Sequence, residues 1–279
     1  ILTLILSLTT WFYLQPALER CREFEFAWIA QIYGRNLVMM IVIAGGLHLY
    51  LLTCKKQGQT LKFDSRDQYH DSRAFTFNNQ VRDNIFWSLA SGVTVWTAYE
   101  VLTMWAFANE YITLLSWQES PVWFALLIVV TPVWNSMHFY VIHRPLHWPV
   151  LYKSVHALHH RNINVGPWAG ISMHPLEHLL YYSSILIHWV VASHPVHVIF
   201  NLHYQTFNAV YAHSGFENLL IGGKRRLALG SFNHQLHHRY FECNYGNAEM
   251  PWDVWAGTFH DGTEQSRLRI RERRRKSQR

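Results

Sequence analysis

The sequence has 279 residues, of which 50% are hydrophobic, 15% aromatic and only 15% charged, and its formal net charge is +6. So few charges, together with thirteen tryptophans, argue against an ordinary water-soluble domain. Nucleic-acid binding is not expected, because the aromatic residues lie in apolar runs rather than among the basic residues. The three cysteines, Cys21, Cys54 and Cys243, form no C-x-x-C pair, which argues against a disulfide framework and a thiolate zinc site.

Apolar runs recur along the chain, and a bilayer is crossed by about 20 apolar residues. Residue 1 is not Met and opens into an apolar run, so we expect a truncated N-terminus with the remnant of a span over 1–14. Further spans are expected over 37–53, 85–107 and 121–142, and a helical hairpin over 176–212. The predicted fold is all-α: a polytopic membrane protein with about four to six transmembrane or re-entrant helices.

Lysine and arginine are unevenly distributed between the connecting segments. They concentrate in 54–84, in 143–174 and after 213, whereas 108–120 contains neither. Positive residues favour the cytosolic side, so the three basic segments should share that side, in a bacterial inner membrane or the endoplasmic reticulum. The basic tail 263–279 is expected to be disordered, or else to contact anionic lipids.

Histidine is the anomaly of the composition, at nineteen residues. The sequence contains "HRPLH" at 143–147, "HALHH" at 156–160 and "HQLHH" at 234–238. On a helix, H-x-x-H-H points three imidazoles along one side, where they should converge on a point. Neutral imidazole is a common ligand of iron, zinc and copper. Eight histidines from three segments on one membrane face could hold two metal ions: His143, His147, His156, His159, His160, His234, His237 and His238.

Two matters stay open at this level. Pro145 removes an amide donor inside "HRPLH", so the helix either kinks there or ends near His143, and a new one begins at Pro145.

A membrane metal transporter is the rival from another functional class. It would need polar ligands at mid-bilayer depth, whereas the paired histidines lie beyond the span ends, and the expected spans contain almost no carboxylate apart from Glu100.

From about 121 to 260 the sequence resembles the fatty acid hydroxylase superfamily, and within it the sterol desaturase branch. The resemblance is carried by the three histidine motifs, with "MHPLEH", "AHSG", "NYG" and "WDVWAGTF" in the same order. It implies a catalytic domain over 121–262 after an N-terminal membrane-spanning region over 1–120. It also implies two iron ions that activate O₂, with electrons from a reductase, cytochrome b5 or ferredoxin. The eight motif histidines match the family's ligands, and His213 in "AHSG" is a ninth candidate.

The implied reaction is the hydroxylation or desaturation of a lipid taken from the bilayer, with a sterol-like substrate favoured. Fatty-acid or sphingolipid, carotenoid and ether-lipid hydroxylases remain alternatives. An all-imidazole site would also accept zinc, so purified protein could carry it. His174 is either near the site or a helix cap, and Asp253 is expected to anchor a turn against the site. Other near-site candidates are His178, His203 and Asn233.

Overall fold

The computed structural model describes residues 1–247 and 249–277, which are mostly helical. The α-helices are α1 (Leu2–Thr9), α2 (Phe26–Met40), α3 (Gly46–His48), α4 (Gln80–Trp87), α5 (Thr94–Ala108), α6 (Pro121–Leu146), α7 (Pro149–Leu151), α8 (Ala157–His160), α9 (Pro175–Tyr182), α10 (Pro195–Ala212), α11 (Phe232–Tyr240), α12 (Trp252–Trp255) and α13 (Glu264–Ser277). Short π-helical segments are η1 (Thr10–Leu14), η3 (Ile41–Gly45), η4 (Leu49–Thr53), η5 (Ser88–Val93) and η6 (Tyr152–His156), and 3-10 helices are η2 (Leu18–Arg22), η7 (Pro167–Ile171) and η8 (Ser183–Trp189). One antiparallel hairpin, which the all-α expectation lacked, pairs β1 (Asn218–Ile221) with β2 (Lys224–Ala228).

Two helical runs are long and apolar enough to cross a membrane. They are Phe26–Thr53, with a mean hydropathy of 1.8, and Pro121–Leu146, with a mean hydropathy of 1.5. Only 28% and 17% of these apolar windows are buried inside the protein. Most of their side chains therefore point outward, as lipid-facing residues would and as the core helix of a water-soluble protein would not.

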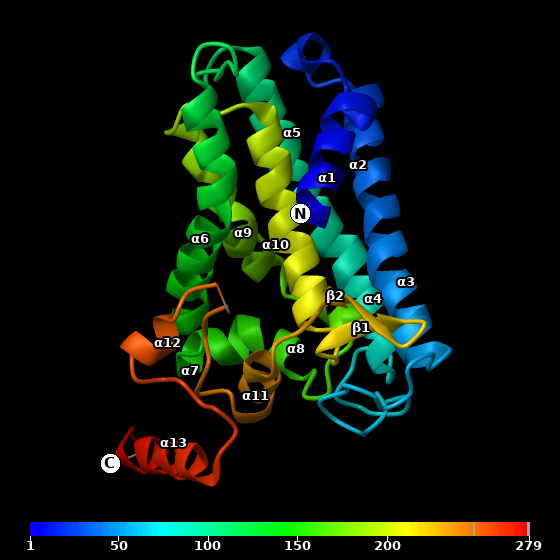
Figure 1. The fold of residues 1–279 in the computed structure, drawn as a ribbon, viewed down its shortest axis with the longest axis vertical. Coiled ribbons are helices and arrows are strands. Elements are labelled where there is room, and N and C mark those ends of the chain that lie inside the picture. Colours follow the sequence, from blue (N-terminus) through cyan, green and yellow to red (C-terminus); the bar gives the residue numbers. More distant parts are fainter. Residues whose placement is uncertain (248, 278–279) are drawn as a thin grey trace.

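The long helices run side by side, and α10 lies in the middle of them (Figure 1). It packs against α1, α5, α6 and η7, and most of its residues are buried, including Ile199, Leu202 and Phe207. The expected hairpin over 176–212 is present: α9 and η8 form one arm and α10 the other. The Tyr181 hydroxyl donates to the Gln205 carbonyl at 2.8 Å and joins the two arms.

The three basic segments meet at one end of this bundle. The loop after η4, the short helices α7 and α8, and the β hairpin with α11 all lie at the lower end in Figure 1. An isolated bridge between Lys62 and Phe216 joins the first of these segments to the third. The three segments thus lie on the same side of the helices, as the charge distribution predicted.

Helix α6 continues through Pro145 and ends at Leu146, which decides between the two readings of "HRPLH". The proline sits in the last turn, where the helix loses one amide donor and soon ends anyway. His147 follows as the C-terminal cap residue with αR backbone angles. His143 and His147 therefore remain one turn apart, and their ring centroids are 5.0 Å apart.

The sequence favoured a disordered tail over 263–279; in the structure Glu264–Ser277 forms helix α13, and residues 278–279 lie outside the described residues. The helix begins after a polar turn in which the Thr263 hydroxyl and the Ser266 hydroxyl both donate to the Asp261 carboxylate. Arg273 also donates to the carbonyls of Gly257 and Glu242. The basic composition suggested a solvated chain, but these contacts hold the helix against the preceding loops.

A buried ion pair joins α2 to α5 between the long helices. Arg35 Nη2 lies 2.6 Å from both carboxylate oxygens of Glu100, and the two side chains are only 6% and 1% exposed. Asn36 completes the network, since its amide accepts from Arg35 and donates to Glu100. Charges so deep in a bundle are tolerated only when paired and hydrogen-bonded.

Replacing Arg35 with Met should lower the free energy of unfolding by about 3–5 kcal/mol, because it leaves the Glu100 carboxylate buried without its partner. Adding Glu100→Leu should recover much of that loss. Thermal unfolding in detergent measures both variants. Lys55→Met, which breaks the exposed pair with Asp67, is the control and should cost less than about 1 kcal/mol. A double variant no more stable than Arg35→Met would contradict the assignment.

Candidate metal centre

Nine histidines gather at the lower end of the bundle in two groups. Within each group the candidate ligand nitrogens all lie within 4.8 Å of one another. Group A consists of His143, His147, His156, His160 and His237; group B consists of His159, His213, His234 and His238. Every member is buried except His147, which is half-buried. The nine are the eight motif histidines together with the ninth sequence candidate, His213.

The two H-x-x-H-H motifs divide their histidines between the groups instead of converging on one point as the sequence suggested. In the first motif, His156 and His160 belong to group A and His159 to group B. In the second, the first and last histidines belong to group B, and the middle one, His237, belongs to group A. The cause is that the two motif helices face each other, so the i and i+4 rings of one meet the i+3 ring of the other.

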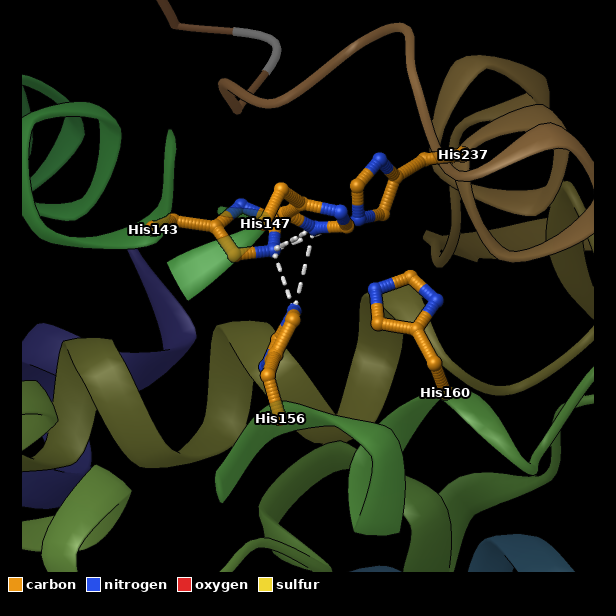
Figure 2. A group of neighbouring side chains, drawn as sticks. All are labelled: His143, His147, His156, His160 and His237. Atoms are coloured by element: carbon orange, nitrogen blue, oxygen red, sulfur yellow. Dashed lines mark hydrogen bonds between the residues drawn. The ribbon is translucent and has the colours of Figure 1, made fainter. Parts of the chain in front are cut away.

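In group A the rings of His143, His156 and His237 point inward through Nε2 and are held from outside through Nδ1; Figure 2 shows the five rings of the group turned toward one another. The Nδ1 atoms of His143 and His237 lie 2.6 Å and 2.7 Å from the carbonyl oxygens of Tyr245 and Cys243. The His156 Nδ1 lies 2.7 Å from Glu177 Oε1. On the inner side, the His143 Nε2 is 3.1 Å from that of His156, 3.2 Å from that of His237 and 3.3 Å from that of His147.

Group B repeats this arrangement. The His213 Nδ1 lies 2.7 Å from the Ala209 carbonyl oxygen, and the His159 Nδ1 lies 3.3 Å from that of Ser172. Inside the group, the His213 Nε2 lies 3.2 Å, 3.0 Å and 2.9 Å from the Nε2 atoms of His159, His238 and His234. The groups adjoin each other, because the rings of His160 and His238 stack with their centroids 4.7 Å apart.

The outer hydrogen bonds fix where the protons are. A carbonyl oxygen can only accept, so each Nδ1 that contacts one carries the N–H, and a neutral ring then has a bare lone pair on Nε2. The rings are neutral, since burial lowers the pKa of His156 to about 3, and burial with neighbouring rings lowers the pKa values of His159, His237 and His238 well below the ordinary value. Several lone pairs therefore face one another across about 3 Å, and a cation placed between them would remove the repulsion.

The donor set fits a metal on further grounds. Neither ring nitrogen of His160 has a hydrogen-bond partner among the described residues, and neither does Nδ1 of His238. Such buried orphan nitrogens are costly in a site without a ligand. Metal-bound histidines are commonly oriented by a carbonyl or carboxylate at the other ring nitrogen, as five of these nine are.

Asp253 supports group A indirectly, through the turn that contains Tyr245, and the sequence suggested such a turn anchor. Its carboxylate accepts from the backbone amides of Tyr245 and Gly246 at 2.9 Å and 2.7 Å. Tyr245 is the residue whose carbonyl accepts from His143. The "NYG" and "WDVW" segments thus hold one carbonyl against one ligand candidate.

The remaining sequence candidates lie outside the two groups. His174 is the N-cap of α9, where its Nδ1 accepts from the Leu176 amide at 3.2 Å. His178 contacts Ser91 and the Ile171 carbonyl. His203 is buried beside Ser7 and Trp96. Asn233 offers its backbone carbonyl to Asn244.

A cavity connects both groups to the interior of the bundle. It holds about 530 Å³ of space free of protein atoms, part of it open to the surroundings, and its lining includes two rings of group A and three of group B. The other lining residues come mainly from α6, α9 and α10, among them Phe139, Met173, Tyr181 and Ala209. Asn135 and Gly170 are among the members that sequence reasoning missed, because an isolated Asn or Gly in an apolar segment gives no motif.

The comparisons with known proteins agree with this geometry. The family model for fatty acid hydroxylase matches residues 124–258. A Delta(7)-sterol 5(6)-desaturase of Gibberella zeae is 27% identical over 84% of this chain and 68% of its own length. The corresponding desaturases of Saccharomyces cerevisiae and Candida albicans are 31% and 32% identical over 43% of this chain, which spans 32% and 30% of theirs. No solved structure matches.

The matched range contains all nine histidines of groups A and B, each of which could hold a metal ion. This chain belongs to the fatty acid hydroxylase superfamily, in its sterol desaturase branch.

Proposed function

We propose that this protein is a membrane-bound, O₂-dependent di-iron oxidoreductase that hydroxylates or desaturates a sterol-like lipid. The observation that carries the proposal is the pair of buried groups of neutral imidazoles, whose Nε2 atoms face one another at about 3 Å. Group A would hold one iron ion and group B the other. The printed activity of the relatives, desaturation of a Delta(7)-sterol at the 5(6) position, supports the substrate class.

The bound iron pair would supply the activation of O₂ and the removal of hydrogen from an unactivated C–H bond. The protein's own residues provide orientation and exclusion of water. The carbonyls of Tyr245, Cys243 and Ala209 and the carboxyl group of Glu177 turn the Nε2 atoms of their imidazoles inward, and burial keeps these rings neutral. The cavity would give a lipid access to both groups from among α6, α9 and α10, and a bound lipid would exclude water from them.

The remaining parts of the proposal concern location and partners. Two apolar helices with exposed side chains support an integral membrane protein, and we propose a multi-pass one with four to six spans. The histidine groups would then lie on the cytosolic side, with the basic segments. Electrons would reach them there from cytochrome b5, a ferredoxin or a reductase. All nine ligand candidates lie in one compact cluster rather than along a path, which disfavours the metal-transporter alternative.

His237→Ala and His238→Ala remove neighbouring residues that belong to different groups. Each variant should therefore bind about one iron ion per chain where the parent protein binds two, and each should lose lipid oxidation. Metal analysis after anaerobic reconstitution measures the first effect. His70→Ala, in an exposed loop, should keep both ions. Retention of two ions by both ligand variants would contradict the assignment of one ion to each group.

Gly170→Ala tests the support of group B. A Cβ at this position would lie 2.6 Å from the Ala209 carbonyl oxygen and 2.7 Å from the Val210 nitrogen, so α10 must shift. The same carbonyl orients His213, and we expect the variant to lose the group B ion and to unfold at lower temperature. Gly46→Ala has open space around the new methyl group and is the matched control. Unchanged metal content in Gly170→Ala would show that His213 does not depend on this contact.

Lipid extracts of cells that express the protein test the reaction itself. Untargeted mass spectrometry should find a neutral lipid that gains one oxygen or loses two hydrogens, relative to cells expressing His237→Ala. A sterol-like precursor should decline in parallel. Identical lipid profiles from the two strains, with iron and an electron donor present, would argue against the proposed activity.

A further inference from the structure

One buried side chain in the cavity has polar atoms that make no hydrogen bond to the described residues. Asn135 lies on α6 and is 2% exposed, and neither its Oδ1 nor its Nδ2 has a hydrogen-bond partner among the described residues. Every other buried asparagine in the described part of the chain makes at least one side-chain hydrogen bond: Asn36, Asn84, Asn162, Asn164, Asn201 and Asn244. An amide buried without a partner costs about 2–7 kcal/mol. Asn135 lines the cavity, so a bound molecule can offset this cost.

A second orphan atom lines the same cavity. Gln205, on α10, donates through Nε2 to the Tyr181 carbonyl at 2.8 Å. That bond fixes the orientation of the amide, because a carbonyl can accept only from the NH₂ end. Gln205 Oε1 is then an acceptor, and it has no partner among the described residues. The cavity wall therefore offers one donor–acceptor amide and one further acceptor.

These atoms select a chemical class. A hydroxyl group both donates and accepts, so it can satisfy the Asn135 Nδ2 and one of the orphan oxygens at once. A ketone or ester oxygen only accepts and would leave both orphan oxygens unpaired. The lining of the cavity contains no lysine or arginine that could pair with an anionic headgroup. The group that fits is a neutral alcohol.

The position of Asn135 on its helix sets the distance to the metal groups. Asn135, Phe139 and His143 lie at i, i+4 and i+8, so Asn135 is about 12 Å along α6 from the level of His143, at 1.5 Å per residue. Phe139 lies between the two levels, with its ring stacked on His143 at 4.5 Å and edge-on to Tyr181 at 6.1 Å. An apolar section thus separates the polar atoms from group A.

We propose that Asn135 and Gln205 form a hydroxyl-binding subsite that holds the alcohol end of the lipid substrate. This inference rests on the proposed function and adds to it the group by which the substrate is recognised. The subsite lies on the order of 10 Å from the ligands of group A.

The test measures binding, so that it does not depend on turnover. Iron-loaded protein in detergent is titrated with a radiolabelled 3β-hydroxysterol and with its 3-deoxy analogue. A fatty alcohol and the alkane of equal chain length form a second pair of probes. The parent protein should prefer the hydroxylated member of a pair by about tenfold, which corresponds to about 1.4 kcal/mol.

Asn135→Leu should abolish that preference by weakening the binding of the alcohol while leaving that of the deoxy analogue unchanged. The variant removes an unpaired buried amide, so its unfolding temperature should not fall. Asn135→Thr retains a donor and an acceptor and should restore part of the preference. Gln118→Leu, at an exposed position in the loop between α5 and α6, is the control and should bind like the parent protein. With turnover present, loss of the anchor should also raise KM and spread oxidation over several carbons.

The outcomes separate this inference from the proposed function. Equal preference in the parent protein and in Asn135→Leu would overturn the subsite and leave the oxidoreductase proposal standing. A preference for the fatty alcohol with no binding of either sterol would support the subsite and refute the sterol-like substrate. Failure of every hydroxylated probe to bind better than its partner would overturn the subsite outright.

Discussion

The structure depends on the repulsion between lone pairs on facing imidazole nitrogens. Hydrogen bonds at the other nitrogen of each ring hold these lone pairs in place. Backbone carbonyls accept hydrogen bonds from the Nδ1–H groups of four imidazoles, the Glu177 carboxyl group contacts a fifth, and burial keeps those rings uncharged. As a result, the Nε2 atoms of His143 and His237, and those of His159 and His213, lie 3.2 Å apart without a proton between them. This arrangement costs the folded chain stability, and a bound cation would offset that cost. The rest of the architecture can be understood as the support for those five contacts.

The support comes from elements that are distant in sequence. Helix α6 brings His143, the short helix α8 brings the first H-x-x-H-H motif, α10 ends at His213, and α11 brings the second motif. The apolar bundle above them fixes the ends of α6 and α10, while the loop segments below close around α11. The cavity lies between these two parts, which is why a lipid held among the helices can meet both histidine groups.

Much of the site could be predicted from residue spacing. The two H-x-x-H-H motifs and "HRPLH" together identified eight of the nine clustered histidines, and the likeness of "AHSG" to the family pattern suggested the ninth. Spacing could not show that each motif serves two groups, because that depends on the face from which a distant segment approaches. The same holds for Glu177, because only the folded chain places its carboxyl group on His156. Asn135 could not be identified from the sequence for a different reason: it stands out only because its buried amide lacks hydrogen-bond partners in the folded chain. In the fold, the basic composition of 263–279 favoured a disordered tail and did not indicate helix α13. The capping turn and the carbonyl contacts that order this helix are properties of the folded chain.

The division of each motif between two groups has a mechanical consequence. Because His237 and His238 are consecutive residues on one rigid helix, a rotation of α11 that improves the fit around one ion must spoil the fit around the other. The spacing between the two groups is therefore set by the geometry of an α-helix and not by flexible loops. Occupation of the two groups should accordingly be coupled: an ion in one group would fix the rotation of α11 and so the positions of the ligands in the other.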